Sequence, residues 1–108
     1  GTAGLTGDGG PAVAASLSGP SGIALVPSGR HLVIYIADYF NGSVRVIAPD
    51  GTLTTLGAPH QFVAPSRLAY RPGGWLYIAN DRGDVKAVNV TKSPAELATL
   101  ARQRKKVI

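Results

Sequence analysis

The residues of this 108-residue chain that could carry chemistry lie mostly in glycine-rich turns. Residues 7–10 read GDGG, a glycine-rich stretch with one carboxylate that could cradle a phosphate or bind calcium. A phosphate loop requires a following helix and a lysine, and calcium requires several oxygen ligands. We therefore expect a connecting turn in which Gly7, Gly9 and Gly10 adopt unusual backbone angles and Asp8 caps nearby amides.

Asp38, Asn80 and two histidines are the other residues that could bind a metal. Asp38 and Asn80 each follow a predicted strand, so we expect their side chains to bond to the backbone two residues on and hold a turn. His31 and His60 are too few for an enzyme zinc site, which needs three protein ligands. Cysteine is absent, and so is a Gly-x-Ser-x-Gly elbow. We predict no catalytic residue, no metal and no cofactor.

Two loops contain the candidate binding residues. Tyr39 and Phe40 lie in the loop at 38–42, where a large aromatic side chain is either an anchor for a partner or packs on a neighbouring repeat. The sequence favours neither alternative. The predicted binding surface consists of Tyr39, Phe40 and Asn41 together with His60 and Gln61, which lie in the glycine- and proline-bounded loop at 57–65.

Composition indicates one small all-β domain. The chain is 44% hydrophobic and 16% charged, and its 14 glycines and 8 prolines indicate many short strands joined by turns. Alternating and β-branched segments predict strands at residues 22–26, 31–37, 43–48, 52–56, 66–70, 75–79 and 84–90. Trp75 begins one of these strands and is expected to pack in the core or between repeats.

The chain contains an internal repeat. Residues 20–27 (PSGIALVP) correspond to residues 65–72 (PSRLAYRP), and residues 35–38 (YIAD) correspond to residues 77–80 (YIAN). The offset between the copies falls from 45 to 42 along the chain, so an insertion lies in a turn between strands. Self-similarity of strand-rich sequence at this period is typical of β-propeller blades.

The order of motifs in the first repeat resembles the NHL repeat family. The segments that carry the resemblance are GDGGPA at 7–12, PSGIA at 20–24, YIAD at 35–38, VRV at 44–46 and PDG at 49–51. The GDGGPA lead-in is similar to NHL repeats of the teneurin-like and bacterial or plant extracellular type. The resemblance implies four-stranded antiparallel blades, about six in a closed propeller, a rigid binding platform, and an extracellular or secretory-pathway location.

The repeat divides the chain into four parts. Residues 1–18 are a lead-in from a preceding blade, 19–57 a first blade, 58–91 a second and incomplete blade, and 92–108 a tail. Two blades cannot bury their own faces. We therefore expect them to pack against other propeller blades, supplied by the same longer chain or by other subunits.

The tail is basic and is predicted to form a short amphipathic α-helix. Ser93, Pro94 and Glu96 form a helix start with a capping box. Four cations follow: Arg102, Arg104, Lys105 and Lys106. Most of the net charge of +5 lies in this tail, so the blades are nearly neutral and nucleic acid is an unlikely partner. No apolar run is long enough to span a membrane.

These observations predict a non-enzymatic scaffold that binds a protein or a glycan within a larger protein or assembly. Two alternatives stay open. One is a fragment of a metal-dependent propeller enzyme of the lyase or lactonase type, whose remaining ligands would lie on other blades. The other is an RNA-binding NHL module, which requires a basic face.

Overall fold

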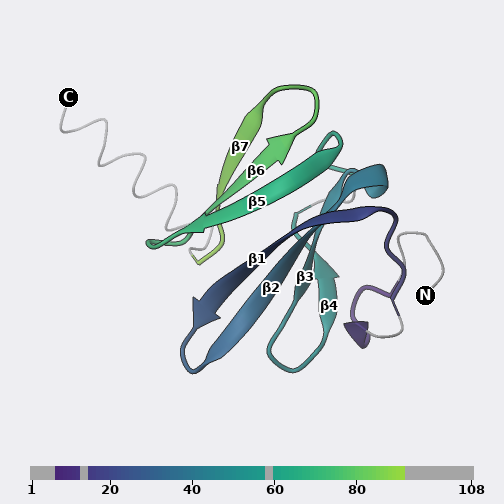
Figure 1. The fold of residues 1–108 in the computed structure, drawn as a ribbon. Helices are drawn as coiled ribbons and strands as arrows, with labels where there is room; N and C mark the ends of the chain where they lie inside the picture. Colours follow the sequence, from purple (N-terminus) through teal and green to yellow (C-terminus); the bar gives the residue numbers. More distant parts are fainter. Residues whose placement is uncertain (1–6, 13–14, 58–59, 92–108) are drawn as a thin grey trace.

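The computed structural model describes residues 7–12, 15–57 and 60–91, which fold into two antiparallel sheets (Figure 1). The first sheet has the order β1 (Pro20–Ser28), β2 (His31–Asp38), β3 (Ser43–Ile47), β4 (Leu53–Thr55); the second has the order β5 (Pro65–Arg71), β6 (Trp75–Asn80), β7 (Val85–Asn89). The predicted all-β class is confirmed. Among the described residues, no helix is long and apolar enough to cross a bilayer.

The predicted strands agree with the observed ones to within two residues at each end. The largest difference is β1, which continues through Pro27 and Ser28 into a two-residue turn at Gly29 and Arg30. Proline is tolerated there because β1 is an edge strand of its sheet. Gly29 has a φ of 60°, which suits the first position of a type II′ hairpin turn.

The second sheet has three strands within the described residues, in keeping with the incomplete second repeat of the sequence. A 3-10 turn, Tyr39–Asn41, joins β2 to β3. The predicted helix at 92–108, with Arg102, Arg104, Lys105 and Lys106, lies outside the described residues.

The two sheets pack face to face and bury most of the apolar side chains between them. We call the face that carries Ile23 in the first sheet and Leu68 in the second sheet the front, and the opposite face the back. The back of the first sheet packs against the front of the second. The buried core between them consists of Ala24, Val26, Tyr35, Val44, Phe62, Leu76 and Ile78, with Val33, Val46, Leu68, Tyr70 and Val88 partly buried against it.

The backbones of β1 and β5 come unusually close at Gly22. A Cβ atom on Gly22 would lie 2.9 Å from the carbonyl oxygen of Ser66 and 3.1 Å from the Cα of Arg67. Beside this contact, the Ser21 hydroxyl donates a hydrogen bond to the carbonyl oxygen of Pro65 (3.1 Å). Glycine at position 22 therefore sets the distance between the two sheets.

We predict that Gly22→Ala destabilises the fold by about 1–3 kcal/mol, because the added methyl group overlaps the β5 backbone and forces the sheets apart. Gly10→Ala is the matched control, since a Cβ atom there would meet its nearest neighbour at 3.4 Å. Urea unfolding followed by Trp75 fluorescence compares the two variants. Equal stability of both would contradict the role given to Gly22.

Candidate functional site

The connections after β2 and β6 and the loop before β5 meet at one end of the two sheets, which we call the loop end (residues 38–42, 60–64 and 80–84); the Phe62 amide donates to the Gly42 carbonyl and the Asp81 amide to the Ala64 carbonyl. Tyr39, after β2, donates a hydrogen bond from its hydroxyl to the carboxylate of Asp81, after β6. This hydrogen bond raises the pKa of Tyr39 and lowers the pKa of Asp81, and the positive charge of Arg67 lowers the pKa of Asp81 further. Tyr39 thus contacts the second repeat through this hydrogen bond.

Phe40 points outward from the loop end, with 75% of its surface exposed. Its ring meets that of Tyr39 edge to face, with the centroids 5.0 Å apart. The Phe40 ring also lies against Gly19, where a Cβ atom would be 2.5 Å from a ring carbon. The Phe40 amide also donates to the carbonyl oxygen of Ser18 (3.0 Å). The ring is thus held in place and still open to a partner.

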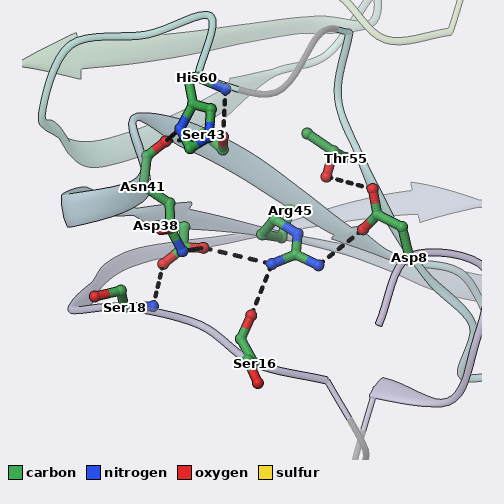
Figure 2. Close-up of polar contacts among 9 residues, drawn as sticks. All are labelled: Asp8, Ser16, Ser18, Asp38, Asn41, Ser43, Arg45, Thr55 and His60. Carbon is green, nitrogen blue, oxygen red and sulfur yellow. Dashed lines mark hydrogen bonds and ion pairs between the residues drawn. The ribbon is translucent and has the colours of Figure 1, made fainter. Parts of the chain in front are cut away.

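A buried arginine that the sequence analysis did not single out lies behind this turn (Figure 2). Arg45 of β3 is fully buried; its Nη2 donates to Oδ1 of Asp8 at 2.8 Å, and its Nη1 donates to the carbonyl oxygen of Ser16 at 2.9 Å. The carboxylate of Asp38, also fully buried, lies 3.5 Å from Nη1. Asp8 accepts a further hydrogen bond from the Thr55 hydroxyl (2.7 Å).

Among the residues that the structure describes, only the first repeat has this charge cluster. Its counterparts in the second repeat are Asn80 for Asp38 and Lys86 for Arg45, and Lys86 is more than half exposed beside Asp84. The joint change from an Asp–Arg pair to an Asn–Lys pair is the signal in the sequence that could have identified Arg45. The alternation of β3 places Arg45 on the front of the first sheet, where the N-terminal segment covers it.

The capping bond predicted for Asp38 is not made, and the Asp8 carboxylate contacts Arg45 and Thr55. Oδ1 of Asp38 accepts from the backbone amide of Ser18 (2.6 Å), which lies before β1, and Oδ2 accepts from the Asn41 side chain (2.8 Å). The side chain makes no cap bond to the turn that follows it. Both aspartates point toward Arg45 because a buried cation needs carboxylate partners more than a solvated turn does.

Asn80 is almost fully buried and hydrogen-bonds to the Asp84 carboxylate, while its Oδ1 has no hydrogen-bond partner among the described residues. Arg82 holds the same carboxylate from the exposed side, through its Nε at 3.0 Å and its Nη2 at 3.1 Å. The hydrogen bond from Arg82 is the main cause that lowers the pKa of Asp84 to about 2. Asp84 is therefore ionised at neutral pH.

The loop that contains His60 docks onto the start of β3 (Figure 2). The His60 amide donates to the Ser43 hydroxyl (2.9 Å), and its ring Nδ1 donates to the carbonyl oxygen of Asn41. A carbonyl can only accept, so Nδ1 carries a proton in this contact. Gly42, with a φ of 59°, accepts from the amide of Phe62 (2.7 Å), whose carbonyl oxygen leaves no room for a Cβ there.

The stretch at residues 7–10 runs along β4 as a connecting segment. The Gly9 amide donates to the carbonyl oxygen of Leu53 (2.8 Å), and the Leu53 amide donates to that of Gly10 (2.9 Å). Gly7 and Gly9 have φ values of 93° and 84°. The unusual backbone angles expected of this stretch thus occur at two of its three glycines.

The remaining predicted residues do not converge on one site. Gln61 lies against the backbone of Gly57. His31 begins β2 and His60 lies near the other end of that strand, so the two histidines cannot share an ion. Within residues 7–12, 15–57 and 60–91, no group of three or more His, Cys, Asp or Glu side chains could hold a metal. Trp75 is half-buried on the back of the second sheet.

Comparison with known proteins found no matching family model, no matching curated protein and no matching solved structure. The resemblance to NHL repeats therefore stays a prediction that rests on the motifs quoted above.

We predict that Arg45→Ala lowers the free energy of unfolding by about 3–5 kcal/mol, because Asp38 would stay buried without its cation. Lys86→Ala removes the corresponding cation of the second repeat and should have little effect, because that side chain is exposed. Urea denaturation of both variants tests the difference. Similar losses in the two variants would contradict the structural role of Arg45.

We predict that Tyr39→Phe raises the pKa of Asp81 toward its ordinary value of 3.8. The lowered pKa means that ionised Asp81 stabilises the fold at pH values above 3.8, and that this stabilisation is lost as the pH falls through the lowered pKa. Titration of the carboxyl carbons by NMR measures the shift. The pKa of Asp84, set mainly by Arg82, serves as the control and should not move.

Proposed function

We propose that the chain is a two-blade segment of an NHL-type β-propeller and that it acts as a protein-interaction scaffold without catalysing a reaction. The observation that carries the proposal is Phe40, which is three-quarters exposed and yet fixed between Tyr39 and Gly19. A rigid aromatic side chain loses little conformational entropy on binding, so it is an efficient anchor for a partner.

The blade assignment is supported by irregularities that the two sheets share. Pairing between β1 and β2 shifts register between Pro20 and Gly22, and pairing between β5 and β6 shifts between Pro65 and Arg67. The two shifts occupy corresponding positions of the repeat, 45 residues apart. Independent hairpins have no reason to share such a bulge, whereas copies of one structural unit keep it.

A protein suits the loop end better than a nucleic acid does. Asp81, which accepts a hydrogen bond from Tyr39 next to Phe40, has a lowered pKa and is ionised at neutral pH, so its carboxylate would repel a phosphate backbone. Further along the same connection, Arg82 adds a positive charge and is paired with Asp84, whose pKa is also lowered. An exposed aromatic ring bordered by charges of both signs is typical of the anchor and rim of a protein interface.

The proposal is tested with a photo-crosslinking phenylalanine analogue at position 40 in the full chain, exposed to extract from the source cells. We expect a discrete protein adduct that excess unmodified chain removes and the Phe40→Ala chain does not. The same analogue at position 30 is the control, because Arg30 lies in the β1–β2 turn at the opposite end of the sheet. Equal labelling at both positions, or adducts with glycans alone, would contradict a protein-binding loop end.

A further inference from the structure

The front of the first sheet exposes a patch of aliphatic side chains that the loop end does not use. Ile23, Leu25 and Leu32 are 62%, 53% and 48% exposed, and Ile34 and Ile36 beside them are partly buried. The N-terminal segment covers the part of this face around Arg45. The part formed by β1 and β2 is left open among the described residues. Apolar patches of this kind mark docking surfaces.

The back of the second sheet is the other outer face of the pair. It carries Ala69, Tyr77, Ala79, Val85 and Ala87 together with two arginines. Val85 is 63% exposed. One of the arginines, Arg71, places its guanidinium over the ring of Tyr77, 5.9 Å from the centroid.

The internal repeat relates these two outer faces to the two faces that are already in contact. Ile23, Leu25, Ile34 and Ile36 on the open front correspond to Leu68, Tyr70, Leu76 and Ile78, which pack inside the chain. On the open back, Ala69, Tyr77, Ala79 and Val85 correspond to Ala24, Tyr35, Ala37 and Val44, which form the other side of that contact. The two open faces therefore match the two packed faces at these apolar positions, whereas Arg71 stands at the position of the core residue Val26 and Arg67 at that of Gly22.

We infer that a second copy of this chain docks the open front of its first sheet onto the open back of the second sheet, repeating the β1–β5 packing between molecules. Such a contact is head-to-tail, and it forms a closed ring where the rotation between copies allows closure. Three copies would supply six sheets, the number that the NHL resemblance implies. The inference rests on the blade stacking of the proposed function and is independent of the loop end.

Arg67 limits how closely two copies approach. It occupies the position that corresponds to Gly22, where a Cβ atom would lie 2.9 Å from the facing backbone. A side chain at that position forces a wider spacing between molecules than between the two sheets of one chain. The contact between copies should therefore be looser and reversible, and Arg67→Gly should tighten it.

Multi-angle light scattering on the full chain over a range of concentrations tests the inference. We expect a mass that rises with concentration toward three times the 11.1 kDa of one chain. Ile23→Lys should return the mass to that of one chain, whereas Val63→Lys should not, because Val63 is similarly exposed but lies outside the strands. Thermal melts of both lysine variants establish that they are folded.

The orientation of the contact is tested by disulfide trapping, since the chain contains no cysteine of its own. A copy with Ile23→Cys on its front should oxidise to a dimer with a copy that has Arg67→Cys on its back, and two Ile23→Cys copies should not pair. Pairing of the two fronts, or a folded monomer at every concentration, would overturn the inference. Because Ile23→Lys leaves Phe40 unchanged, crosslinking at position 40 should persist in that variant. Loss of the contact between copies can therefore be told apart from loss of partner binding at the loop end.

Discussion

The contact between the two sheets is the constraint on which the rest of the structure depends. Each sheet is a single layer with an apolar face that must be covered, and the absence of a side chain at Gly22 lets β1 and β5 approach closely enough to cover it. Tyr35 and Tyr70 face each other across this contact, and burial raises the pKa of Tyr35. The same packing brings the loops after β2 and β6 together, so that Tyr39 reaches Asp81.

The buried cation performs a second and more local task. Arg45 ties the N-terminal segment to β3 through Asp8 and Ser16, and it also contacts Asp38 at the start of the turn that carries Phe40. Burying charges is costly, and such clusters are more readily explained by specificity of arrangement than by stability. Here the arrangement fixes the base of an exposed turn, which is what a rigid binding surface requires.

The sequence was sufficient for the class, the repeat and nearly all strand positions, because period-two alternation and turn residues act locally. The change from Asp–Arg to Asn–Lys between the repeats marks Arg45, but alternation along β3 identifies only a face and not the distant segment that covers this side chain. The same limit explains Asp38, whose partners come from Ser18 and Asn41 and not from the turn beside it. Gly22 looked like any other glycine, since its close contact lies 44 residues away in the chain, at Ser66. The sequence could not decide between the two alternatives for Tyr39 and Phe40; in the structure Tyr39 contacts Asp81 of the second repeat, whereas Phe40 is exposed.

Native-state hydrogen exchange on the full chain is the most direct test of the central claim that the two sheets are one cooperative unit. The account predicts that the slowest amides of β2 and of β6 open with the same free energy and the same dependence on denaturant. The opening free energies of both sets of amides should shift together when Gly22 is replaced by alanine. Separate opening free energies for the two sheets, with only one set affected by the substitution, would contradict the account.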